Sequence, residues 1–134
     1  MAIKQAIRSL FINDATLTSL IGARVSPRIS KTGDTLPRVV YLRTNVSDSV
    51  HTTGSSSLRI DSFNFIIESN SSDECDTISE RIKLIFESVL NQTHEGTFIR
   101  RCLIQNENEG NFYPEGREKP IYETMQGWNI IYNG

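Results

Sequence analysis

The side chains best suited to catalysis are two histidines, two cysteines and a short acidic segment. Asp48, Ser49 and His51 are the residue types of a nucleophilic triad, in which a histidine takes the serine proton and a carboxylate orients the imidazole. They are almost adjacent in the sequence, whereas the members of such triads usually come from separated segments. His51 lies in a polar segment and His94 stands beside Glu95, so both histidines are interpreted as solvated surface residues.

Metal and phosphate sites are not predicted either. Cys75 and Cys102 lie far apart and form no Cys-x-x-Cys pair, so the chain offers too few ligands for zinc. Both cysteines fall on apolar patterns and are interpreted as small core residues. The acidic segment from Ser72 to Asp76 has the composition of a cation site, but helix capping and the helix dipole explain its acids more simply. The glycines are isolated, so no phosphate loop is expected. We therefore predict that the protein is not an enzyme and binds no cofactor or metal.

The length and composition are typical of one small domain. Residues 1–134 are predicted to form a single core. The apolar share of 37% is low, which favours long polar loops or a core completed by neighbouring subunits. With 14 basic and 16 acidic side chains the net charge is −2, and a nucleic-acid-binding protein normally carries a basic excess. Residues 1–20 mix charged and apolar side chains, so neither a signal peptide nor a membrane span is predicted, and both thiols are expected to stay reduced in a cytoplasm.

Three segments have the apolar spacing of amphipathic helices. Residues 2–13 form the first, and residues 15–21 form the second, between a good N-cap at Asp14 and a C-terminal stop at Gly22. The third begins at Ser72 as its N-cap. Its apolar stripe is the longest in the sequence: Cys75, Ile78, Ile82, Ile85, Phe86 and Val89.

Five segments are predicted to be strands: residues 24–29, 38–43, 58–69, 98–105 and 122–132. Pro27 places the first at a sheet edge, since proline has no N–H to donate. The alternation in 58–69 switches faces near Phe65, which indicates either a bulge or a strand covered on both sides at its far end. Residues 47–57 and 106–121 are predicted to be long polar loops. The order α-α-β-β-β-α-β-β predicts an α+β fold, with a mostly antiparallel sheet of about five strands and helices packed on one face.

The predicted loops and the strand ends hold the candidate interaction residues. Phe112 and Tyr113 lie among mixed charges that include Arg117, a composition that protein interfaces favour. A loop folded back onto the domain explains the same pattern equally well. Three further candidates are arginines at strand ends, interpreted either as donors of salt bridges between subunits or as solvated charges: Arg24, Arg28 and Arg38.

A series of motifs runs through residues 2–92. The first helix is followed by DATLTSLIG, by ARVSPRI, by a polar loop and by LPRVVYL, and then by a long strand and an amphipathic helix. This series resembles the tail completion, or tail terminator, proteins of bacteriophages with long tails. The resemblance rests on these positions: Leu10, Leu17, Leu20, Gly22, Arg24, Val25, Pro27, Leu36, Pro37, Val39, Val40 and Tyr41.

The resemblance implies a small α+β subunit that forms a ring, a homohexamer, at the head-proximal end of the tail tube. Such a ring stops tube polymerisation and joins the tail to the head, so the implied partners are further copies of the chain, the tail tube protein and the head connector or neck protein. The implied location is the virion, after assembly in the host cytoplasm and without a membrane. DNA would pass through the lumen, and the near-neutral charge predicts no tight binding to it.

Two other non-catalytic functions are left open. A head-completion or adaptor protein would sit on the connector and would not stop tube growth. A monomeric binding module would stay monomeric at high concentration. If the chain forms a ring, its subunits need two different complementary edges. Pro27 and Pro37 are interpreted as holding residues 28–36 at a set angle, which lowers the entropy lost on docking.

Overall fold

A computed structural model describes residues 2–27, 36–51, 54–116 and 118–133. Three helices and six strands follow one another along the chain: α1 (Ala2–Ile12), α2 (Ala15–Ile21), β1 (Val25–Pro27), β2 (Arg38–His51), β3 (Gly54–Ser69), α3 (Ser72–Glu87), β4 (Leu90–His94), β5 (Thr97–Phe112) and β6 (Ile121–Asn133). The strands form one sheet in the order β1-β2-β3-β6-β5-β4, in which only β1 and β2 are parallel. The predicted α+β class and mostly antiparallel sheet are confirmed, with one strand more than expected.

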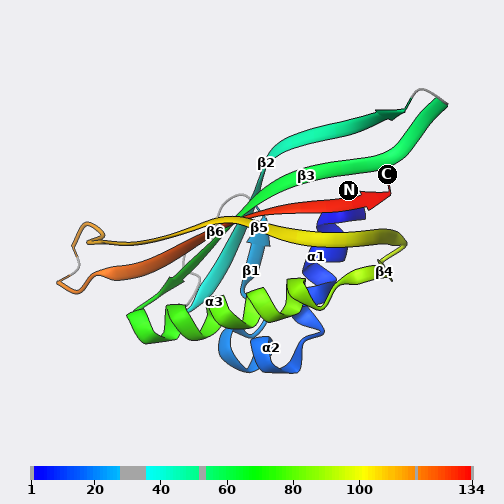
Figure 1. Cartoon of the computed structure of the whole chain (residues 1–134). Coiled ribbons are helices and arrows are strands. Elements are labelled where there is room, and N and C mark those ends of the chain that lie inside the picture. The colour runs from blue at the N-terminus through cyan, green and yellow to red at the C-terminus, as the bar shows by residue number, and fades with distance from the viewer. Residues whose placement is uncertain (1, 28–35, 52–53, 117, 134) are drawn as a thin grey trace.

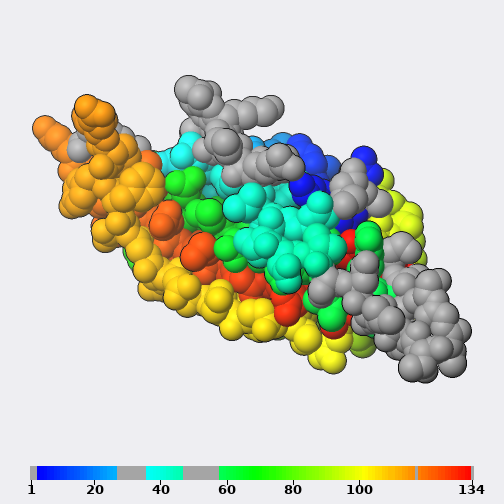
Figure 2. Space-filling view, turned by 90° about the horizontal axis from the view of Figure 1, so that it is seen from above, coloured from blue at the N-terminus to red at the C-terminus, as the bar shows by residue number. Residues whose placement is uncertain are grey.

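All three helices lie on the same side of the sheet (Figure 1). α3 contacts β3, β5 and β6, and α1 contacts α2, α3 and β1. The opposite face is made by strands, which are seen from above in Figure 2. In the described part of the chain, no helix has the length and the apolarity needed to cross a membrane.

Capping residues explain where helices α2 and α3 begin and where α2 ends, and the apolar residues of α3 are buried against the sheet. Asp14 caps α2 by accepting a hydrogen bond from the N–H of Leu17 at 2.8 Å, and Gly22 ends it with a φ of 60°. The cap of α3 is Ser71 and not the predicted Ser72, because the Ser71 hydroxyl accepts from the N–H of Glu74 at 3.3 Å. The predicted apolar stripe is buried throughout, although its last residue, Val89, lies beyond the end of α3 at Glu87; the residues on α3 are Cys75, Ile78, Ile82, Ile85 and Phe86.

An aromatic cluster joins the helices to the sheet. The ring of Phe86 on α3 lies 5.4 Å from Phe11 on α1, 5.2 Å from Phe65 on β3 and 4.9 Å from Trp128 on β6, between centroids. All four side chains are fully buried. Tilted pairs at these distances are favourable, so this cluster fixes the helix layer over the centre of the sheet.

The first segment predicted to be a long loop is largely strand and the second is strand in part, so the prediction is wrong for residues 47–51, 54–57 and 106–112, whereas the described residues from 113 to 120 form a connection. β2 continues to His51 and β3 begins at Gly54, while β5 continues to Phe112. From Ile104 to Phe112, every residue of β5 is exposed. This end of β5 therefore shows no alternation of buried and exposed side chains, and its polar composition looks like a loop. Backbone pairing with β6 up to Ile121 holds it in the sheet.

β4, a short exposed strand that forms a hairpin with β5, was also not predicted. The turn between them places Glu95 and Gly96 at positive φ, as a two-residue hairpin turn requires. β3 pairs with β6 without interruption, so the predicted bulge near Phe65 is absent there. Instead, the far end of β3 is covered on both sides, as Ile67, Glu68 and Ser69 are all buried.

Candidate interaction surface

The two thiols lie in settings that disfavour catalysis. Burial raises the pKa of Cys75 to about 11 and the pKa of Cys102 to about 12. Both therefore stay protonated at neutral pH, whereas a nucleophilic cysteine needs a thiolate. Among the described residues, no group of three side chains is placed to hold a metal ion. The side chains of the triad-like segment lie outside the described residues: Asp48, Ser49 and His51.

Arg24 ties together the entrances of two strands. Its Nε donates a hydrogen bond to the carbonyl oxygen of Pro37 at 2.7 Å, and its own carbonyl accepts one from the N–H of Val39 at 2.9 Å. These contacts hold the residues before β2 against the start of β1. Pro27 ends β1 at the sheet edge, as predicted. The candidate Arg28 and residues 29–35 lie outside the described residues.

Arg38 opens β2 and pairs with the neighbouring strand. Its Nε lies 2.9 Å from Oε1 of Glu68, the residue directly opposite on β3, and both side chains are mostly covered. Opposite charges at facing positions stabilise a strand pair. Arg24 and Arg38 thus each make a contact within the subunit, and their part in salt bridges between subunits stays a prediction.

Phe112 and Tyr113 lie at the far end of the β5–β6 hairpin, which projects past α3 (Figure 1). Phe112 pairs with Ile121 in the last pair of the hairpin, and Tyr113 follows it with 66% of its surface exposed. Both aromatic side chains are therefore exposed, Phe112 as the last residue of a strand rather than in a loop and Tyr113 in the connection that follows it. The candidate Arg117 lies outside the described residues.

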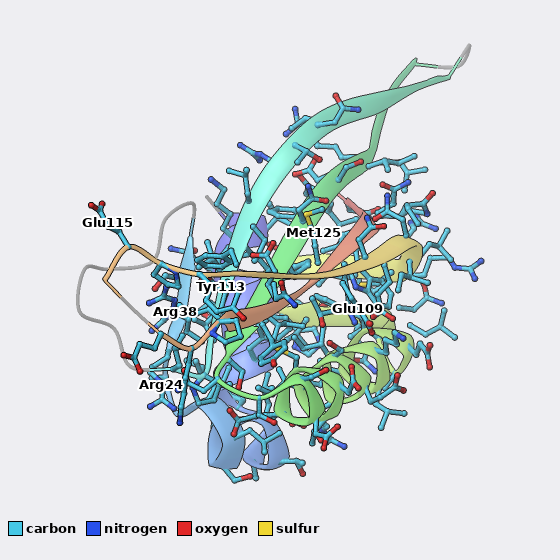
Figure 3. The ribbon with its side chains drawn as sticks, turned by 90° about the vertical axis from the view of Figure 1, so that its left-hand side faces the viewer. Arg24, Arg38, Glu109, Tyr113, Glu115 and Met125 are labelled. Carbon is cyan, nitrogen blue, oxygen red and sulfur yellow. The ribbon has the colours of Figure 1, made fainter. Side chains whose placement is uncertain are left out.

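The strand registers bring the described candidates to one end of the sheet. One row of facing residues crosses four strands there: Arg38, Glu68, Glu123 and Gly110. Phe112 lies two residues beyond Gly110 on β5. Figure 3 shows Arg24, Arg38 and Tyr113 on the same side of the molecule. We call this region the sheet-end surface and define it by five residues: Arg24, Arg38, Phe112, Tyr113 and Glu123.

A second surface, at the outer edge of β5, was missed from the sequence. Leu90, with 62% of its surface exposed, and Ile104, with 40%, flank a depression of about 380 Å³. We call it the edge depression, and its apolar lining is Val89, Leu90, Cys102, Leu103, Ile104 and Trp128. The only signal in the sequence was single apolar residues in polar surroundings. Such residues are common on protein surfaces and identify no site by themselves.

A second depression, of about 460 Å³, lies between α1 and α3 and contains an ion pair. Arg81 donates two hydrogen bonds to the carboxylate of Asp14, from Nε at 2.8 Å and from Nη2 at 2.6 Å. These bonds hold the pKa of Asp14 below its ordinary value of 3.8. Because Asp14 also caps α2, the pair fastens the start of α2 to α3, and we interpret it as structural.

Comparison with known proteins gives a match at the level of the fold. No protein-family model matches the chain, and no curated protein does. Among solved structures, a chain from the virion of a native gene transfer agent particle superposes with a TM-score of 0.77. The match covers 99% of this chain and 96% of that chain, with 11% sequence identity. At this identity the likeness shows a shared fold.

Proposed function

We propose that this chain is a structural protein of a phage-like virion. In this proposal it forms a hexameric ring at the head-proximal end of the tail tube, ends tube polymerisation and joins the tail to the head connector. The observation that carries the proposal is the likeness to a virion chain, which extends over 99% of this chain at a TM-score of 0.77. The motif series in residues 2–92 supports the tail-terminator role within such a virion.

The sheet-end surface is the proposed contact with the tail tube. It combines two exposed aromatic side chains, Phe112 and Tyr113, with charged side chains such as Glu123. Buried aromatic anchors dominate many protein interfaces, and charged residues around them set the partner's orientation. The position of these aromatics at the end of a projecting hairpin lets them reach a neighbouring protein without rearrangement of the core (Figure 1).

The same proposal places DNA in the lumen of the ring without a tight grip. The chain carries a net charge of −2, and a protein that binds phosphates must supply a local excess of lysine or arginine. We therefore expect no retention of duplex DNA at physiological salt. A head-completion or adaptor protein of the same virion is the second candidate, and it shares the structural role but does not stop tube growth.

Tube assembly separates the two candidates. The purified chain is added in increasing amounts to polymerising tail tube protein of the same virus, and tube lengths are measured by electron microscopy. We expect shorter tubes that end in a ring. Tubes of unchanged length would contradict the terminator role and favour the adaptor. A chain that stays monomeric at high concentration and in the presence of tubes would instead favour a binding module.

The tube contact has its own test in the two aromatic residues. The double substitution Phe112→Ala and Tyr113→Ala is expected to raise the concentration needed to shorten tubes by about tenfold or more, since anchors of this kind contribute about 2 kcal/mol or more. The stability of the subunit is expected to change little because both side chains are exposed. Leu84→Ala is the matched control, because Leu84 is an exposed apolar residue on α3. Equal inhibition by the double variant and the control would show that the sheet-end surface does not bind the tube.

A further inference from the structure

Besides the outer edges of the terminal strands β1 and β4, two lengths of sheet edge have no described strand beside them. β4 pairs with β5 only as far as Arg101, so the outer edge of β5 is open from Cys102 to Phe112. β1 pairs with β2 only as far as Tyr41, so the outer edge of β2 has no described neighbour from Leu42 onward. The backbone N–H and C=O groups of an open edge are a template for pairing with another chain.

The two open edges face outward in opposite directions within the plane of the sheet, and they lie at the same level along the strands. Two rows of facing residues show this: Leu42, Asn64, Gly127 and Asn106 form the first, and Val46, Asp61, Ile130 and Cys102 form the second. Leu42–Val46 on β2 is therefore level with Cys102–Asn106 on β5. The order and directions of the strands make β2 and β5 antiparallel to each other. A second copy placed beside the first in the same orientation thus brings its β5 antiparallel to β2.

The side chains on the two edges are complementary in shape. Val46 pairs with Asp61, whose side chain is fully buried on the helix side of the sheet. The side chain of Val46 therefore also points to the helix side, and 43% of its surface is exposed. On the other edge, Ile104 stands opposite the buried Trp128 and borders the edge depression on the same side. In a sheet that continues from copy to copy, side chains on the same side meet. An exposed valine on one edge therefore faces a depression on the other that is lined by six apolar residues together with Glu87 and Arg101.

The charges of the two halves of the chain are also complementary. Residues 1–69, which include β1, β2 and β3, carry eight basic and five acidic side chains, a formal charge of +3. Residues 70–134, which include β4, β5 and β6, carry six basic and eleven acidic side chains, a formal charge of −5. Contact between the β2 side of one copy and the β5 side of the next brings these opposite charges together. Contact between two β2 edges, or between two β5 edges, would instead bring together halves with charges of the same sign, which repel each other.

We propose that β2 of one copy pairs antiparallel with β5 of the next copy, with Leu42–Val46 beside Cys102–Asn106 and Val46 in the edge depression. The inference rests on the proposed ring and says how it closes. A contact between two different edges leaves one edge of each kind free at the two ends of the growing assembly, so it repeats and closes when the rotation allows. The sheet then continues around the ring, and Leu42–Val46 and Cys102–Asn106 are both covered.

Cysteine cross-linking between separately purified variants tests this pairing. One variant carries Asn45→Cys and the other Leu103→Cys, two residues that the strand registers place level with each other. Both variants carry Cys102→Val because Cys102 is the neighbour of Leu103. Facing strand residues fall within the Cα separation of about 4.4–6.8 Å that a disulfide spans. We expect a covalent dimer after oxidation of the mixture and none from either variant alone. Asn45→Cys mixed with Leu84→Cys is the control and is expected to give none, since Leu84 lies on α3 and outside both edges.

The remaining outcomes separate the inference from the proposed function. Rings or tube capping without the mixed cross-link would overturn the pairing and leave the function standing. Cross-linking of a single variant with itself, or a chain that never associates, would overturn the pairing as well. The mixed cross-link in a chain that leaves tube growth unchanged would support the pairing and contradict the terminator role.

Introducing one charge, and then an opposite charge across the contact, tests the same pairing without cysteines. Val46→Glu is expected to raise the dissociation constant of the association by about tenfold or more, because it removes the apolar contact of Val46 and places a charge among mostly apolar side chains. Adding Ile104→Lys is expected to recover most of that loss. Both positions are exposed in the subunit, so both variants are expected to fold. Circular dichroism checks the folding, and an unchanged dissociation constant in Val46→Glu would overturn the placement of Val46.

Discussion

Single residues in this molecule often serve two elements, and Asp14 shows how. Its carboxylate accepts a hydrogen bond from the N–H of Leu17 at the start of α2, and it accepts two more from Arg81 of α3. An asparagine at this position keeps the capping oxygen but carries no charge. The substitution Asp14→Asn therefore separates the ion pair from the cap.

The pH dependence of Asp14→Asn follows from the lowered pKa. Hydrogen bonds from Arg81 hold the pKa of the folded carboxyl below 3.8. The stability contributed by the charge is fully present above that unfolded value and is lost as the pH falls through the folded pKa. We expect the variant to be less stable than the wild type near neutral pH, and the difference to shrink below the unfolded pKa. Urea unfolding at about pH 7 and about pH 3 measures it, and a difference independent of pH would contradict this account.

At Gly127, in the middle of β6, a Cβ atom would come too close to a neighbouring side chain. A Cβ at Gly127 would lie 2.5 Å from Oδ1 of Asn106 and 3.4 Å from Oδ1 of Asn64. We expect Gly127→Ala to lower the free energy of unfolding by about 1 kcal/mol, because the Asn106 side chain must move. In an Asn106→Ala background the cost is expected to fall, and a double-mutant cycle measures the coupling. Equal costs in both backgrounds would show that Asn106 is not the obstacle.

At the scale of elements, the β4–β5 turn contains a residue that its backbone does not favour. Glu95 has a φ of 49° and Gly96 a φ of 77°, and such turns favour asparagine followed by glycine. We expect Glu95→Asn to raise the free energy of unfolding by about 0.5–1 kcal/mol, since asparagine tolerates the left-handed region better than other non-glycine residues. Glu95→Ala is the matched control, because it removes the same charge without that preference. Thermal unfolding that ranks alanine level with asparagine would contradict the explanation.

The elements divide into those that local sequence predicts and those that it does not. The helices and the buried part of β3 were predicted because their apolar residues recur with the period of the element, as in the stripe from Cys75 to Val89. The exposed end of β5 has no such period, and only its pairing with β6 makes it a strand. The candidate site follows the same division. Arg38 was predicted at a strand entrance, but its partner Glu68, thirty residues later, depends on the strand register.

At the scale of the whole molecule, two long hairpins extend beyond the helix layer in different directions (Figure 1). The β5–β6 hairpin places the sheet-end surface at one end of the sheet, and the β2–β3 hairpin extends from the other. The open edges lie between these ends. A subunit of this shape has separate surfaces for the two contacts that the proposed ring requires, one with a neighbouring copy and one with a further partner.

The charge difference between the two halves of the chain predicts how assembly responds to salt. Salt shortens the screening length from about 10 Å at 0.1 M to about 3 Å at 1 M, so attraction between the +3 half of one copy and the −5 half of the next weakens. Apolar contact at Val46 is not screened, so association is expected to fall with added salt without vanishing. Sedimentation at fixed protein concentration measures the fraction of assembled rings across this range. Glu109→Gln removes one exposed charge from the open edge of β5 and is expected to flatten the dependence. Association that strengthens with salt would show that apolar contact, and not charge, selects the β2 edge as the partner of β5.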